Sequence, residues 1–460
     1  MAMLATNPTR PIRNFTSVKP TALGIDLLVV LLGVGCSFNL HLVGEFPITE
    51  AALILLLPVL ISFDGRKLLR PGLKPIFMLL LLWLGSQVVT DVYRGTASAD
   101  WMRGDANIVF FAVDLVCLAI LLGKVERRKI LFAVAFAIGS LLSARYQPTD
   151  VVLVDPWKFG YSTGVTMLVL LVCNVFFNIR WYAVIFVLLS GLAAVNLLMN
   201  FRSPVLGILI TMAMVIPMIP ERIGRVRILP PVGTRLRVVV LAGLVLGAAA
   251  AAVGLLNYVT ASGLAGEDAR AKNEVQSRSE GGIMLGGRPE ILISSRAVIE
   301  SPIIGHGSWA KDMKYVEMLS DIRAENFIKT DLQDIEDKSK GLIPTHSHIM
   351  GAWVWAGILG ATFWAYVFWL DLRAMIQVAI LRPRNAPLYA WLFVGLAWDI
   401  LFSPFAGTRR ATESLILIII VDLADTAAAA LKSLKLHRQQ RPQWRRLPSR
   451  WPPPRIPQPR

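Results

Sequence analysis

Runs of about 20 apolar residues recur along most of this chain, and they constrain its fold more than any other feature. Each run can cross a hydrocarbon layer of about 30 Å as a helix that rises about 1.5 Å per residue. The composition agrees, because 55% of the 460 residues are hydrophobic and only 17% are charged, against about 25% in soluble domains. The sequence therefore predicts an all-α polytopic membrane protein and excludes a soluble enzyme of two or three domains.

About twelve membrane spans are expected from these runs. They cover residues 23–40, 46–63, 75–93, 106–123, 129–144, 161–178, 181–199, 203–219, 238–260, 347–370, 386–403 and 411–431. The first run leads straight into the second, so no cleavable signal peptide is expected. The chain divides into a tail (1–22), helices one to nine (23–261), a large loop (262–345), helices ten to twelve (346–431) and a tail rich in Pro and Arg (432–460).

The distribution of basic residues predicts the orientation of the spans. Most of the 47 lysines and arginines fall in short segments on the same side as the N-terminus. Because cytoplasmic loops are enriched in Lys and Arg, both termini are expected in the cytoplasm and the large loop outside. The net charge of +16 then reflects topology, so we expect membrane lipids as partners of the basic tail and no nucleic acid.

The three cysteines and the metal-binding residue types show no site pattern. Cys36, Cys117 and Cys173 lie inside apolar runs without paired spacing, so they are expected to be small buried hydrophobes. No His-Glu-x-x-His spacing, cysteine cluster or carboxylate ligand set is present, so no metal is expected.

The loop over 262–345 is large enough to form a folded element outside the membrane. Pro289 opens a short helical pattern, and the pattern ends at Ser301-Pro302. This helix can carry an apolar face that lies on the bilayer or on neighbouring spans. Its members would be Ile291, Leu292, Ala297, Val298 and Ile299.

Two histidines stand where this loop enters the tenth expected span. A neutral imidazole at His346 or His348 can accept a proton from a hydroxyl near physiological pH. The same pattern would also arise from a histidine that only hydrogen-bonds the helix start. Gly357 and Gly360 follow about three turns deeper, where small residues let helices approach closely.

Arginines on the outer face run against the usual charge bias. They are Arg145, Arg202, Arg288, Arg409 and Arg410. A guanidinium binds phosphate through a planar fork, and Arg288 also precedes a helix N-terminus, which favours anions. Each arginine alone could snorkel to lipid phosphate. Together with a histidine, they indicate a phosphorylated, membrane-borne substrate.

These residues resemble the signature of the O-antigen ligase and polysaccharide polymerase family of bacterial inner-membrane glycosyltransferases. His346-Ser347, nine residues, Gly357, two residues and Gly360 is similar to a family motif in which His and then Asn, Ser or Gln precede Gly-x-x-Gly. Arg202-x-x-x-Leu206 is similar to a second motif. Gly287-Arg288-Pro289, running on to Pro302-Ile303-Ile304-Gly305-His306-Gly307, is similar to the loop pattern.

The resemblance implies a GT-C-like enzyme of the inner membrane with its large loop in the periplasm. It would move a glycan from undecaprenyl-pyrophosphate to an acceptor hydroxyl of the lipid-A core or of another glycan, with inversion and without metal or cofactor. His346 would be the catalytic base, and His348 would orient it or touch the sugar. Arg202 and Arg288 would neutralise the pyrophosphate, with further contributions from Arg145, Arg409 and Arg410.

Two alternatives stay open. An O-antigen or exopolysaccharide polymerase needs the same base and the same arginines as a ligase, and the form of the histidine motif favours the ligase slightly. A secondary transporter or flippase is indicated by Asp114, because a carboxylate in the middle of a span is commonly an ion or proton site. Asp399 lies nearer the outer end of its span and could line a catalytic cavity instead.

Overall fold

The computed structural model describes residues 20–41, 45–220, 222–223, 226–227, 234–263, 270, 289–325 and 341–439. These parts are almost entirely helical. The strands in them form two antiparallel hairpins, β1 (Asn39–His41) with β2 (Glu45–Pro47) and β3 (Arg222–Ile223) with β4 (Val226–Arg227). The expected all-α class is confirmed.

From α1 to α9 the helices follow one another with short connections, as expected for a polytopic chain. The α-helices are α1 (Pro20–Gly35), α2 (Ile48–Asp64), α3 (Lys74–Arg94), α4 (Ser98–Leu122), α5 (Glu126–Tyr146), α6 (Asp150–Val154), α7 (Ser162–Asn178), α8 (Tyr182–Leu198), α9 (Arg202–Val215), α10 (Thr234–Ala261), α13 (Glu290–Glu300), α14 (Met313–Glu325), α16 (His348–Ala356), α17 (Ile358–Leu381), α18 (Ala386–Phe402) and α19 (Gly407–Gln439). Short turns of other helix types are η1 (Gly65–Leu69), η2 (Trp157–Tyr161) and η3 (Ile216–Met218).

Eight helical segments of the described chain are long and apolar enough to cross a membrane. They are Ile48–Leu69, Lys74–Arg94, Ser98–Leu122, Glu126–Tyr146, Trp157–Asn178, Val238–Ala261, Ile358–Leu381 and Gly407–Ser433. Shorter apolar helices over Leu23–Gly35, Tyr182–Leu198, Arg202–Met218 and Ala386–Phe402 coincide with four further expected spans. Large apolar side chains such as Phe63 (84% exposed) and Leu55 (77% exposed) cover the outside, where lipid rather than water is the favourable neighbour. The chain is thus a polytopic membrane protein, and the count of about twelve spans stays a prediction.

The structure differs from the sequence prediction at the expected span 347–370. α16 ends at Gly357, whose φ of 73° lies in the left-handed region, and α17 then begins in a new direction. Glycine adopts this conformation without steric cost. The long apolar helix of this region is therefore α17 alone.

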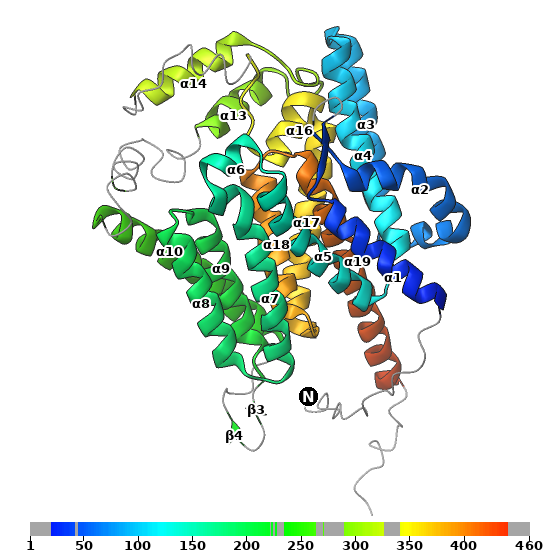
Figure 1. Ribbon diagram of the computed structural model, residues 1–460, viewed down its shortest axis with the longest axis vertical. Helices are drawn as coiled ribbons and strands as arrows, with labels where there is room; N and C mark the ends of the chain where they lie inside the picture. The colour runs from blue at the N-terminus through cyan, green and yellow to red at the C-terminus, as the bar shows by residue number, and fades with distance from the viewer. Residues whose placement is uncertain are drawn as a thin grey trace, which may run out of the picture.

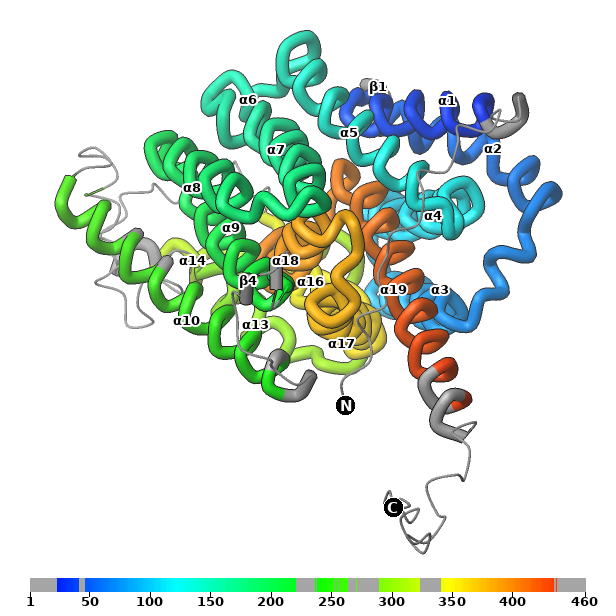
Figure 2. Tube along the Cα trace, turned by 90° about the horizontal axis from the view of Figure 1, so that it is seen from below, coloured from blue at the N-terminus to red at the C-terminus, as the bar shows by residue number. Residues whose placement is uncertain are grey.

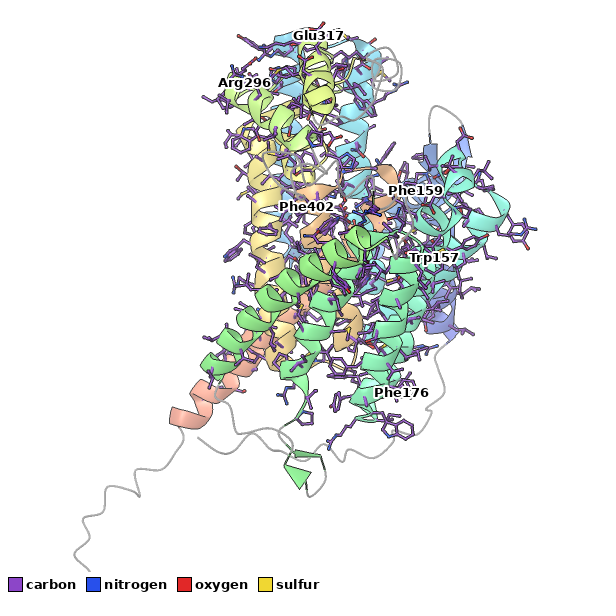
Figure 3. The ribbon with its side chains drawn as sticks, turned by 90° about the vertical axis from the view of Figure 1, so that its left-hand side faces the viewer. Trp157, Phe159, Phe176, Arg296, Glu317 and Phe402 are labelled. Atoms are coloured by element: carbon purple, nitrogen blue, oxygen red, sulfur yellow. The ribbon has the colours of Figure 1, made fainter. Side chains whose placement is uncertain are left out.

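One end of the molecule is covered by an outer cap, defined here as α13, α14 and α16 (Figure 1). Figure 3 shows Arg296 of α13 and Glu317 of α14 at this end and Phe176 of α7 at the opposite end. The cap has a small hydrophobic core of its own. It includes Ile293 of α13, Tyr315 of α14 and Val354 of α16. α13 thus packs on protein, whereas the sequence left the bilayer open as its neighbour.

The buried face of α13 is only partly the expected one. Ala297 and Val298 are buried as expected, but Leu292 and Ile299 are exposed. Ile293 and Ser294 are buried in their place. The face is therefore rotated towards α14 and α16, and α16 belongs to the expected span 347–370, one of the neighbours that the sequence prediction allowed.

The centre of the bundle is formed by α4, α17, α18 and α19, between the α8–α10 flank and the α2–α3 flank (Figure 2). Aromatic rings fill it at the level of α16. The rings of Trp83, Phe111, Phe363, Trp364 and Phe405 have centroids 5.1 to 6.1 Å apart. This cluster fixes the start of α17 against α3 and α4.

Ion pairs tie the middle of α19 to the connections beside α3 and α4 and to the first turn of α5. Asp425 pairs with Arg70 (3.0 Å) and Lys124 (2.8 Å), and Asp422 pairs with Arg70 and Lys129. These basic residues thus hold α19 about halfway along its length.

Candidate functional site

Ser347 positions His346 at the start of α16. The hydroxyl of Ser347 accepts a hydrogen bond from the backbone N–H of Met350 and donates one to the carbonyl of Ile400 in α18 (2.7 Å). The first contact is an N-cap, which satisfies one of the free N–H groups of the helix. His346 itself is exposed. The sequence therefore holds an accessible imidazole beside the positive end of a helix, next to the α18–α19 connection.

His348 is completely buried and both of its ring nitrogens have protein partners. Nδ1 lies 2.6 Å from the carbonyl oxygen of Ser403, and Nε2 lies 2.7 Å from Oε1 of Glu413 in α19. A carbonyl only accepts hydrogen bonds, so Nδ1 carries a proton. The imidazole also packs edge-on against the indole of Trp364, with 4.7 Å between the ring centroids. His348 thus joins α16 to α19 from inside the protein.

Arg410 lies one turn before Glu413 and is buried, with 5% of its surface exposed. Its Nε and Nη2 donate to the two carboxylate oxygens of Glu50 in α2 at 2.7 and 2.6 Å, and Nη1 donates to Asn107 in α4. The guanidinium also lies over the ring of Phe110, 5.4 Å from its centroid. This bidentate geometry is the strong form of an arginine–carboxylate contact, and it compensates for the burial of both charges.

Asp114 is completely buried in α4, and neither of its carboxylate oxygens has a hydrogen-bond partner among the described residues. It interacts electrostatically with Glu50 and Arg410. One arginine neutralises only one carboxylate, and an unpaired buried charge is costly. Arg410, Glu50 and Asp114 therefore carry no net charge when one of the two carboxylates is protonated.

Arg409 precedes Arg410 and pairs with Asp399 of α18. About a third of the Arg409 side chain is exposed (34%). We call the group formed by Glu50, His346, His348, Asp399, Arg409, Arg410 and Glu413 the α19 entrance cluster. It combines an accessible imidazole, a partly accessible guanidinium and two buried pairs that hold them in place.

The sequence-predicted residues are only partly brought together. His348, Arg409 and Arg410 lie around the start of α19, and His346 precedes Ser347, which contacts Ile400 near the end of α18. Arg202 is half-buried at the start of α9, which packs on α18 so closely that a Cβ at Gly207 would lie 2.9 Å from the ring of Trp391.

Two further predicted arginines lie elsewhere. Arg145 is exposed at the end of α5, where it lies over the ring of Tyr146 (5.8 Å). Arg288 falls outside the described residues.

The loop motif and the glycine motif are in direct contact. A Cβ at Gly357 would lie 1.9 Å from the carbonyl oxygen of Ile303, and one at Gly305 would lie 2.7 Å from the nitrogen of Gly357. Backbone hydrogen bonds from His306 to Val354 (2.7 Å) and from Ile358 to Ile303 (3.3 Å) join the two segments. The glycines are thus required by a backbone-to-backbone contact that sets where α16 ends.

Sequence reasoning missed Glu50, Asn107 and Glu413. The two glutamates carry the same signal that singled out Asp114, a carboxylate inside an apolar run. Their partners could not be inferred, because Glu50 and Arg410 are separated by 360 positions in the sequence.

No group of three or more His, Cys, Asp or Glu residues within the described ranges could hold a metal ion. No protein-family model matches the sequence, and no curated protein matches it either. The chemistry available in the described part of the site is therefore that of an imidazole, several arginines and hydrogen-bonded carboxylates.

Proposed function

We propose that this protein is a membrane glycosyltransferase of the O-antigen ligase type. It moves a glycan from undecaprenyl-pyrophosphate to an acceptor hydroxyl, with the lipid-A core as acceptor, at the periplasmic face of a bacterial inner membrane. The observation that carries the proposal is the accessible His346, whose neighbour Ser347 hydrogen-bonds the carbonyl of Ile400 in the last turn of α18, the helix that also supplies Asp399 to Arg409. The resemblance of the three motifs to that family supports it.

In this proposal His346 removes the proton of the acceptor hydroxyl. The oxygen attacks the anomeric carbon while the bond to the pyrophosphate breaks, which inverts the configuration at that carbon. A positioned base of this kind contributes about 10²- to 10⁴-fold to the rate. His348 and Glu413 act as positioning residues, because their buried hydrogen bond holds the segment that carries His346.

The departing pyrophosphate needs positive charge, and the arginines differ in how readily they supply it. Arg410 already has its charge matched by Glu50 through two hydrogen bonds. Arg409 is partly accessible and pairs with Asp399. A pyrophosphate can compete with Asp399 for the guanidinium of Arg409. Arg409 is therefore the first candidate, together with Arg202 and, from the resemblance, Arg288. Arginine charge at this point performs the electrostatic stabilisation without a metal.

A polymerase of the same family is the nearest alternative. It would use the same base and arginines, and it differs only in its acceptor, which is a second carrier-linked glycan. The residues that line the acceptor's binding site decide between the two acceptors, and no residue of the three motifs does.

A proton-coupled transporter or flippase is the candidate from another class. It is favoured by Asp114 and by Asp371 in α17, which are both fully buried with carboxylate oxygens that lack partners among the described residues. Buried carboxylates at membrane depth are commonly proton sites. A transporter depends on Asp114 and tolerates the loss of His346, whereas the enzyme depends on His346.

The test is the surface-glycan profile of a strain that lacks the gene, complemented with the wild type, His346→Ala, Asp114→Asn or Arg66→Ala. For a ligase we expect His346→Ala to leave long chains on the carrier lipid and none on the lipid-A core. A polymerase instead leaves single carrier-linked units or a surface glycan capped at one repeat. Arg66→Ala is the control, because Arg66 is exposed in η1 and belongs to none of the motifs.

Each variant must be present in the membrane at the wild-type level, as an immunoblot shows. A normal glycan profile with His346→Ala would overturn the enzyme proposal. Loss of the surface glycan with Asp114→Asn alone would support the transporter.

A further inference from the structure

A cavity of about 200 Å³ opens beside the outer cap and shares no residue with the α19 entrance cluster. Its walls come from the α3–α4 connection with the adjoining helix ends and from the loop between α13 and α14. The lining includes Arg94, Asp100, His306, Ser308, Trp309 and Lys311. Among them, only His306 belongs to a sequence motif.

Trp309 in this cavity has an unusual backbone conformation. Its φ is 50°, in the left-handed region that bulky side chains rarely adopt. Such conformations persist only where the surroundings impose them, and they gather at ligand sites. One neighbour is Trp355, on which the indole of Trp309 stacks with 5.6 Å between centroids and 28° between planes. The indole N–H of Trp309 is buried and has no hydrogen-bond partner among the described residues.

Buried hydrogen bonds fix the residue before Trp309. The backbone N–H and the hydroxyl of Ser308 both donate to the carboxylate of Asp91 at 2.6 Å, and Gln87 donates to the same hydroxyl at 2.6 Å. Gly307 precedes it with a φ of 92°, and a Cβ there would lie 2.5 Å from the hydroxyl oxygen of Thr96. The floor of the cavity is thus formed before any ligand arrives, which lowers the entropic cost of binding.

The charged groups around the cavity already have partners. Lys311 pairs with Asp100 at 2.7 Å. Arg94 keeps its positive charge while it donates to the carbonyl of Gly305 (2.9 Å) and to the hydroxyl of Ser301 (2.6 Å). The rim thus has both hydrogen-bond donors and acceptors. It suits a ligand that has hydroxyl groups around an apolar face.

We infer that this cavity is a sugar subsite for the glycan of the proposed enzyme, with Trp309 as its platform. A sugar ring has an apolar face of C–H bonds, which packs on an indole, and hydroxyls at its edge, which Lys311 and Asp100 can bind. The inference deepens the proposed function and rests on it for the identity of the glycan.

The position of the subsite defines which sugar it holds. Trp355 lies in the last turn of α16, and His346 directly precedes the first turn. The nine residues of α16 span roughly 13 Å at about 1.5 Å per residue. The sugar on Trp309 is therefore not the reacting one but a unit further along the chain. A contact that stays the same in the bound substrate and in the transition state contributes uniform binding, which appears in KM and not in kcat.

The probe for the test is the oligosaccharide that mild acid releases from the carrier lipid of the strain that carries the gene. Its binding to the full-length protein in nanodiscs is measured by calorimetry. Trp309→Gly removes the indole and suits a left-handed backbone, so it separates binding from folding. Trp369→Ala is the control, because Trp369 is exposed on α17, outside the cap.

We expect Trp309→Gly to weaken binding about tenfold or more, Trp309→Phe to weaken it less, and His346→Ala and Trp369→Ala to bind like the wild type. In a transfer assay, Trp309→Gly should raise KM and leave kcat unchanged. Equal binding by Trp309→Gly and the wild type would overturn the inference, and so would an absence of binding by the wild type.

The two proposals fail in different ways. If His346→Ala restores a normal surface glycan while Trp309→Gly still loses binding, the enzyme proposal falls and the sugar subsite stands. If His346→Ala abolishes transfer while Trp309→Gly binds normally, only the subsite falls.

Discussion

Glu413 and His348 share a hydrogen bond of 2.7 Å although 65 positions separate them in the sequence. Because Nδ1 of the histidine keeps its proton for the Ser403 carbonyl, a second proton must lie between Nε2 and the carboxylate. The pair is electrically neutral whichever of the two holds that proton. It can therefore be buried without a counter-charge while it ties α16 to α19.

Removal of the Glu413 carboxylate should destabilise the protein. Glu413→Ala leaves Nε2 of the buried His348 without a partner, which costs about 1–3 kcal/mol, whereas Glu413→Gln keeps a hydrogen-bonding group in place and should cost less. Thermal unfolding in detergent measures the difference. Glu317→Ala is the control, because Glu317 is exposed on α14. Equal unfolding temperatures for Glu413→Ala and the wild type would show that the hydrogen bond does not stabilise the fold.

Removal of one partner of the Arg410–Glu50 pair should lower the free energy of unfolding more than replacement of both partners by apolar residues. Arg410→Met alone leaves a buried carboxylate uncompensated and should cost about 3–5 kcal/mol. The double variant Arg410→Met/Glu50→Leu removes both charges and should recover much of that loss. Denaturant unfolding of both variants tests this. A double variant no more stable than Arg410→Met would contradict the prediction.

Gly357 should not tolerate a side chain. Gly357→Ala forces a Cβ against the Ile303 carbonyl and leaves alanine at a φ of 73°, for a cost of at least about 2 kcal/mol. Gly85→Ala in α3 is the matched control, because no atom lies within 4 Å of its Cβ, and it should be neutral or slightly stabilising. Unfolding temperatures in detergent compare the two. The prediction fails if Gly357→Ala unfolds at the same temperature as Gly85→Ala.

The outer cap should lose one source of stability in strong acid. Lys314 and Tyr315 donate hydrogen bonds to Glu300 and lower its pKa to about 2, from an ordinary value of about 4.3. A depressed pKa means that this stabilisation is complete above about pH 4.3 and is lost as the pH falls through about 2.

Protease protection of the cap, followed against pH, tests this in Glu300→Gln. The variant should be less protected than the wild type at neutral pH. The difference should shrink between about pH 4.3 and pH 2, as Glu300 of the wild type becomes protonated. A difference that stays constant across that range would contradict the assigned contacts. Glu317→Gln, at an exposed position of the same cap, should follow the wild type throughout.

The sequence was sufficient for the helical class because membrane burial leaves a simple signal, the length of an apolar run. It was insufficient at Gly357, since an apolar run of residues 347–370 looks the same whether the helix continues or turns. The left-handed backbone there depends on Ile303, which lies 54 positions earlier and approaches only in the folded chain.

The candidate site divides in the same way. His346, Arg409 and Arg410 could be named from residue type and position at span ends. Glu50 and Glu413 could not be assigned partners, because a pairing between distant helices depends on how the helices pack and leaves no local pattern. The subsite at Trp309 was invisible for the same reason, since its backbone strain and its stacking on Trp355 arise only when the loop meets α16.

The close contact between Gly357 and Ile303 also bears on how such a chain can change during evolution. Neither segment can alter its backbone alone, because the carbonyl of Ile303 occupies the space that any side chain at position 357 would need. Among relatives of this protein, the loop segment and the α16–α17 turn should therefore vary together. A chimera that exchanges the loop should fold only when it brings its own partner turn with it.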